Sequence, residues 1–197
     1  VLRVHPAATS AEARNRRHFD FLQVVISRTL LERITDPRRF DDIDPALALP
    51  VTSVMMQSQV LKPGECFVSV NAGADCIYVF AMTRDDFRAS VIDNPRGAVT
   101  ARFRNYARLN ARAPVKEARV SVDAAAARLG EILLRDIADM IRRSSAIHAA
   151  LDASLAGAPF ETLACPGEDA PLLVSHDVVR VPGAAFLRYL RARAATA

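Results

Sequence analysis

Apolar residues recur at helical spacing near the start of the chain, and this pattern predicts a helix over residues 10–35, which Asp36-Pro37 would end. The residues that form its apolar face are Phe19, Leu22, Ile26 and Leu30, widened by Phe21, Val25 and Leu31. The stretch 36–50 follows with three prolines and four aspartates. Such a composition indicates a linker that runs over a surface.

The clearest strand signal lies between residues 66 and 92. Three runs rich in β-branched and aromatic residues, 66–70, 76–82 and 87–92, are separated by short turns. Since consecutive strands joined by short turns pair antiparallel, we expect a three-stranded meander. A short helix over residues 51–60 should precede it, and Lys62-Pro63-Gly64-Glu65 should form the connecting turn.

Helical spacing returns after the meander. It predicts one helix from Asn94 to Pro114 and a second, long helix over about 123–143. Beyond these we expect a buried strand at 146–151, one or two short strands within 172–181 and a helix starting near Gly183. The expected fold class is therefore α/β of the α+β type. The expected core face of the long helix consists of Leu129, Ile132, Leu133, Ile137, Met140 and Ile141.

Composition adds a strong bias toward arginine. The 197 residues are 51% hydrophobic and carry a net charge of +4, and 24 of the 26 basic residues are arginines because only Lys62 and Lys116 are lysines. This bias fits a GC-rich genome, or binding of phosphate groups by guanidinium. The basic residues are scattered among 22 acids and Trp is absent, which disfavours nucleic-acid binding. The best basic patch comprises Arg102, Arg104, Arg108 and Arg112. It is either a solvated helix face, which is the favoured interpretation, or a docking site for an acidic partner.

Candidate catalytic residues are few. His148 and Cys165 follow the His-then-Cys order of caspase-like peptidases, but His148 lies in an apolar run and Cys165 precedes an acidic loop that would raise its pKa. A buried histidine and an inert thiol are the favoured interpretation. No run is long and apolar enough to span a membrane, and no phosphate-binding glycine loop is present, so we expect no membrane segment and no cofactor.

The cysteines and the acidic linker are the remaining candidate ligand sites. The odd set Cys66, Cys76 and Cys165 has no C-x-x-C spacing, which argues against a disulfide framework or a zinc site and favours a reducing compartment, by default the cytoplasm. The aspartates of the linker lack the glycine and the terminal glutamate of a calcium loop. These aspartates are Asp41, Asp42 and Asp44.

Several motifs occur in an uncommon order. Residues 61–65 resemble a family motif "L-x-P-x-E", residues 78–85 resemble "v-f-v-V-T-r-d", and residues 150–163 resemble "v-P-D-g-a-L-x-x-l-P-F-e-a-L". The long helix stands at "LY-x-L-L-l-P-l", and residues 172–179 resemble "yL-i-e-r-y-a-v-s". Together they resemble the front part of a CHAT-domain protein, a member of a caspase- and separase-like cysteine peptidase family. One departure is Leu151-Asp152-Ala153, which lacks the glycine of "P-D-G".

The resemblance implies an N-terminal helical extension at 1–50 and a pseudo-caspase lobe at 51–197. It implies that this lobe is non-catalytic and acts as a scaffold between an upstream sensor region and a downstream protease lobe that carries the catalytic His and Cys, in a bacterial cytoplasmic hydrolase. Its partners would be that protease lobe and a protein activator or substrate. Two alternatives stay open: a self-contained hydrolase that uses His148 or His176 with a cysteine, and an arginine-based binder of nucleic acid or of an acidic protein.

Overall fold

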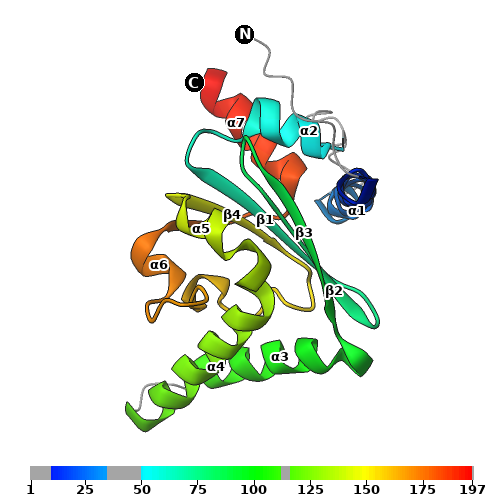
Figure 1. Ribbon diagram of the computed structural model, residues 1–197. Helices are drawn as coiled ribbons and strands as arrows, with labels where there is room; N and C mark the ends of the chain where they lie inside the picture. The colour runs from blue at the N-terminus through cyan, green and yellow to red at the C-terminus, as the bar shows by residue number, and fades with distance from the viewer. Residues whose placement is uncertain (1–9, 35–49, 112–115, 197) are drawn as a thin grey trace. The chain divides into compact units, whose positions relative to one another are not determined.

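The structure is a computed structural model that describes residues 10–34, 50–111 and 116–196. Most of the predicted linker, including Asp41, Asp42 and Asp44, lies outside these residues, as does Arg112. The chain divides into two compact units, Leu61–Val181 and the pair of segments Val1–Val60 with Pro182–Ala197 (Figure 1). The predicted boundary after residue 50 stays a prediction.

A mixed five-stranded sheet forms the centre of the unit Leu61–Val181. Strands β1 (Glu65–Ala72), β2 (Cys76–Met82) and β3 (Phe87–Asp93) pair antiparallel in sequence order, which confirms the predicted meander. Strand β4 (Ala146–Leu151) lies parallel to β1, and β5 (Asp177–Arg180) lies parallel to β4. The strand order is β3-β2-β1-β4-β5, so the α/β fold class is confirmed.

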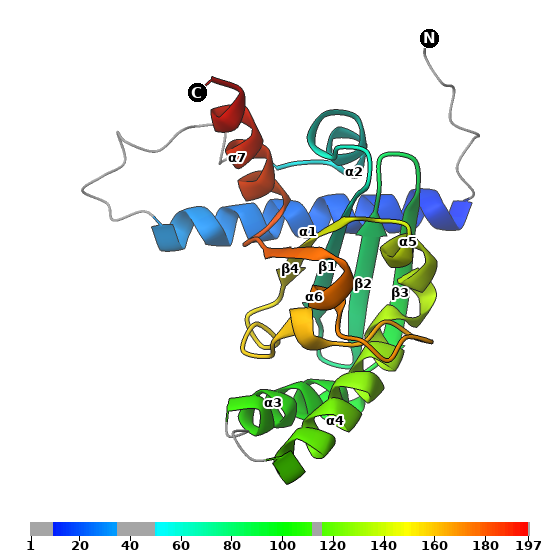
Figure 2. The same cartoon turned by 90° about the vertical axis from the view of Figure 1, so that its left-hand side faces the viewer.

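Helices cover one face of this sheet. Helices α3 (Ala98–Ala111), α4 (Lys116–Leu134) and α5 (Ala138–Arg142) lie on the same side in Figure 1 and Figure 2. Alternate strand residues point toward them and join one apolar core with them. The core residues predicted for the long helix are buried, with Ile132 partly so. The strand residues of this core face include Cys66, Val68, Val70, Ile147 and Ala149.

The prediction of one continuous helix over 123–143 was wrong, because the helix is broken after Leu134. Helix α4 ends at Leu134, a 3-10 turn η5 (Arg135–Ile137) follows, and α5 starts at Ala138. The break coincides with contacts from β3: Arg88 donates to the Asp136 carbonyl at 3.2 Å and to both Asp139 carboxylate oxygens, at 2.6 and 2.8 Å. Local helix propensity does not reveal such contacts, and tertiary context can override it.

The segment after β4 differs in part from its prediction. Residues 153–157 form a turn although position 153 is alanine instead of the glycine of "P-D-G", and Asp152 Oδ1 accepts a hydrogen bond from Ser154 N at 2.8 Å. A single 3-10 turn, η6 (Phe160–Thr162), follows. Residues Leu172–Ser175 are a short helix, α6, rather than a strand, since Pro171 precedes them and Leu172 enters the core.

The unit made of Val1–Val60 and Pro182–Ala197 is helical where it is described. It contains α1 (Ser10–Ile34), α2 (Ser53–Met55), the π-helical turn η3 (Met56–Val60) and α7 (Ala184–Thr196). The side chain of Asp20 accepts from Ser53 N at 2.6 Å, and that of Gln23 accepts from Ala184 N at 3.3 Å. Helix α1 therefore caps the first residues of two other helices.

This capping corrects the predicted apolar face of α1. Phe19 is fully buried as expected, but Phe21 is 65% exposed and Val25 46% exposed, while Gln23 is buried. A polar side chain occupies the inner position because it satisfies a helix N-terminus. None of the helices among residues 10–34, 50–111 and 116–196 is long and apolar enough to cross a bilayer.

Candidate functional site

His148 lies in the middle of β4 and is 6% exposed. Its Nε2 atom is 3.6 Å from Oε2 of Glu65, the first residue of β1, and the same carboxylate oxygen accepts from Lys62 N at 2.9 Å. Neither side chain of this pair is more than about an eighth exposed. The imidazole of His148 therefore lies next to the carboxylate of Glu65, at the start of β1.

Cys165 lies in the loop between η6 and α6 and is 1% exposed. Its Sγ donates a weak hydrogen bond to the Ala138 carbonyl at 3.8 Å. Burial raises the pKa of this thiol and Glu168 raises it further, while Arg142 opposes the increase. Because the thiolate is the nucleophilic form, Cys165 is held in its unreactive state at neutral pH.

The sheet separates these two residues. Ile147 and Ala149 join the helix-covered core, to which Cys165 also belongs, so His148 between them points to the opposite face. The candidate dyad of His148 and Cys165 is not brought together. A nucleophile needs its base within hydrogen-bonding reach, and a sheet lies between these two side chains.

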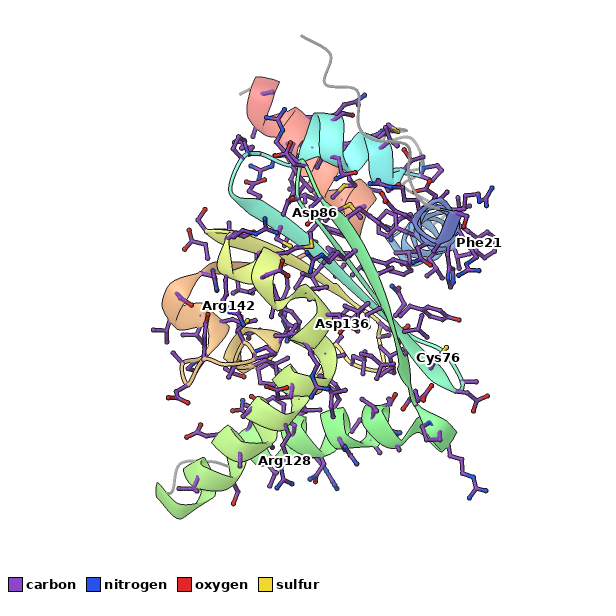
Figure 3. All side chains as sticks on the ribbon, in the orientation of Figure 1. Phe21, Cys76, Asp86, Arg128, Asp136 and Arg142 are labelled. Atoms are coloured by element: carbon purple, nitrogen blue, oxygen red, sulfur yellow. The ribbon has the colours of Figure 1, made fainter. Side chains whose placement is uncertain are left out.

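The other cysteines do not supply a thiolate beside His148. Cys66 points into the helix-covered core, and burial raises its pKa from 9.0 to about 12. Cys76 begins β2 at the hairpin end of the sheet, which Figure 3 shows well away from Arg142. Phe67 of β1 pairs with His148 on one side and with Met82 of β2 on the other. Cys76 lies six residues along β2 from Met82, and six residues of a strand span about 20 Å, so Cys76 is far from His148.

His176 links two segments of the backbone. Its Nδ1 is 2.8 Å from the Ser144 carbonyl, so this nitrogen carries the proton and donates it. The ring follows α6 directly and fastens that turn to the residue that precedes β4 by two positions. His176 Nε2 is buried without a hydrogen-bond partner among the described residues. Cys165 Sγ donates to the Ala138 carbonyl, so the two side chains do not form a His–Cys pair. The arrangement is that of a structural imidazole.

The predicted basic patch lies on α3. Arg102, Arg104 and Arg108 are exposed, and none of the three forms an ion pair within the described part of the chain. Phe103 and Tyr106, on the other side of the helix, are buried. At 100° per residue Arg104 and Arg108 share one flank of α3, and Arg102 lies on the opposite flank.

Two arginines that the sequence did not indicate as site residues donate hydrogen bonds to backbone carbonyls of loops. Arg142 Nη2 donates to Pro166 O at 2.6 Å, and its Nε is 3.4 Å from Glu168. Arg180 donates to the carbonyls of residues 156 and 158 and to Glu161 Oε2 at 3.1 Å. Because guanidinium offers five donors in a fixed fork, these contacts explain part of the arginine content without a ligand.

The Glu65–His148 pair was also missed. Its signal is not local, because it depends on parallel pairing of β1 with β4, two strands separated by more than seventy residues. Among the residues described, no three His, Cys, Asp or Glu side chains are grouped so that they could hold a metal ion.

No protein-family model matches the chain, and a search of curated proteins gives no match either.

Proposed function

We propose that this chain is the non-catalytic front lobe of a CHAT-family cysteine endopeptidase, a scaffold between an upstream sensor region and a downstream protease lobe. The ordered motifs at 61–65, 78–85 and 150–163 support the family. The chemistry of the thiols supports a non-catalytic role, since Cys165 and Cys66 are buried with raised pKa values. The free thiols support a reducing, cytoplasmic setting.

The observation that carries a scaffold role is the outer edge of β5, which pairs with no further strand among the residues that the structure describes. Asp177 N donates to Ser145 O and Val181 N donates to Ala149 O, both at 2.9 Å. Since N–H groups alternate in direction along a strand, the N–H and C=O groups of Val178 and Arg180 point away from β4. The last strand of the sheet order thus offers backbone donors and acceptors for one further strand.

Exposed apolar side chains lie on and next to this edge strand. Val179 of β5 is 46% exposed, and Leu173 and Val174 of the neighbouring α6 are 51% and 67% exposed. Apolar surface beside an unpaired strand edge is unfavourable for a chain without a partner. We assign this edge to a strand of the protease lobe of the same polypeptide.

The test is to produce this chain and the protein segment that the same reading frame encodes after Ala197 as separate polypeptides, and to measure their association by light scattering. Val178→Pro removes an outward N–H group and spares the bonds to β4, so it should abolish association while circular dichroism stays unchanged. Val179→Lys, which places a charge beside the edge, should do the same without a backbone change.

Val54→Lys, at an exposed valine of α2, is the matched control and should associate normally. If the two polypeptides do not associate, or if Val178→Pro and Val179→Lys both associate as the unchanged chain does, the proposed edge contact is wrong.

A further inference from the structure

The segment that contains α3 carries basic residues and no acidic ones. Between Asp93 and Glu117 the sequence has no acidic residue, and it carries six basic ones: Arg96, Arg102, Arg104, Arg108, Arg112 and Lys116. On α3 itself, Arg104 and Arg108 are one turn apart, about 6 Å along the helix axis. Their positive charges are therefore neighbours that no acidic residue of the same helix neutralises.

A hollow accompanies these two side chains. It has a volume of about 430 Å³, and the described residues that line it are Ala101, Arg104 and Arg108. Arg108 Nη2 donates to Asn105 Oδ1 at 3.0 Å, which orients its guanidinium along the helix. Arg128 is a further exposed arginine on the neighbouring helix α4 (Figure 3). The hollow combines the methyl group of Ala101 and the aliphatic stems of two arginines with a concentrated positive charge.

The helix that presents the hollow is firmly held. Asn94 Oδ1 accepts from Val99 N at 2.8 Å and from Thr100 N at 3.3 Å, so the start of α3 is capped. The opposite face buries Phe103 and Tyr106, and the Tyr106 hydroxyl is hydrogen-bonded to Thr162 Oγ1. Arg104 and Arg108 therefore project from a backbone that need not be ordered when a ligand binds.

We propose that this hollow is a binding site for an acidic, partly apolar segment of another protein, with a carboxylate held between Arg104 and Arg108. A guanidinium pairs with a carboxylate through two parallel hydrogen bonds, and the apolar lining suits a neighbouring aliphatic side chain. This inference does not depend on the proposed peptidase family, because it uses only α3 and its hollow.

Charge alone would also attract nucleic acid, but the geometry favours a peptide. The aromatic residues of α3, Phe103 and Tyr106, are buried, so α3 offers no ring on which an unpaired base could stack. Arg102 projects from the other flank, so the positive strip is narrow, whereas nucleic-acid binding relies on contacts with many phosphates.

The experiment measures fluorescence anisotropy with three labelled probes: a short peptide of alternating glutamate, leucine and serine, the same peptide with glutamine for glutamate, and an oligothymidylate. The glutamate peptide should bind and weaken as salt rises from about 50 to about 200 mM, and the glutamine peptide should not bind. Arg104→Gln and Arg108→Gln should each weaken binding by about fivefold, and the double variant by about 25-fold.

The matched control is the double variant Arg84→Gln/Arg102→Gln, which removes the same charge from exposed positions outside the hollow. It should bind the glutamate peptide as the unchanged protein does. The proposal is overturned by an equal loss in both double variants, by no binding of the glutamate peptide at low salt, or by tighter, Arg104-dependent binding of the oligothymidylate. Thermal unfolding of every variant should match that of the unchanged protein.

Discussion

Gly130 lies inside α4 at a point where the helix meets the backbone of Ala164. A Cβ atom built on Gly130 would be 2.0 Å from the Ala164 carbonyl oxygen and 3.1 Å from its carbon, well inside van der Waals contact. Both groups belong to the backbone, so no side chain can rotate away. Gly130→Ala therefore forces α4 or the loop before Cys165 to move.

Gly130→Ala combines a loss of stability from the clash with a gain in helix propensity. Alanine is favoured over glycine inside a helix by about 1 kcal/mol. Overpacking a well-filled core costs about 1–3 kcal/mol, occasionally more, and a clash between two backbones should lie at or above the upper end. We expect a net loss of about 2 kcal/mol, which lowers Tm by about 4–8 °C for a chain of this length.

Thermal unfolding followed by circular dichroism measures this loss. The matched control is Gly157→Ala, since a Cβ there meets no atom within 4 Å, and its Tm should not fall. Gly130→Ala should also make Cys165, the neighbour of Ala164, easier to alkylate. A Gly130→Ala variant as stable as the unchanged protein would refute the close packing of α4 on the 164 carbonyl.

Three further predictions concern the thiols and a loop arginine. With iodoacetamide at neutral pH, Cys76 should be modified before Cys66 and Cys165, because burial raises the pKa of both buried thiols; modification of Cys165 at the rate of a free thiol would contradict this. The Cys66 thiol loses its proton near pH 9.0 in the unfolded state but only near pH 12 in the folded state. The stabilisation is therefore fully present below pH 9, and the free energy of unfolding falls above pH 9 by up to about 1.4 kcal/mol per pH unit. Chemical denaturation from pH 8 to 11 should show this slope, and Cys66→Ala, but not Cys76→Ala, should reduce it. Arg180→Met should cost about 1 kcal/mol and speed hydrogen exchange at residues 156–158, whereas Arg135→Met, which loses only an exposed pair with Glu131, should change neither.

Local patterns predicted most of the elements correctly. The meander followed from three β-branched runs with short turns, and the buried side of α3 followed from Val99, Phe103 and Tyr106. These signals are strong because each lies within one continuous segment. The strand at 146–151 was also predicted, although its alanines give it a weak β propensity.

Non-local contacts account for what the sequence did not reveal. The break after Leu134 coincides with contacts between β3 and η5, and the α1 face was misassigned because Gln23 caps a helix more than 150 residues later. The separation of His148 from Cys165 likewise depends on which face of β4 the helices cover. Such contacts join segments that are far apart in the chain, so spacing within one segment cannot reveal them.

The central proposal is that this chain is the non-catalytic front lobe of a cysteine peptidase, whose catalytic histidine and cysteine lie outside residues 1–197. The most direct test is the complete amino-acid sequence of the natural polypeptide, obtained by peptide mapping and intact mass. From the resemblance, the proposal predicts a segment after Ala197 in which a histidine followed by glycine ends one strand and a cysteine follows the next strand. A natural polypeptide that ends at Ala197, or continues without that histidine and cysteine, would contradict it.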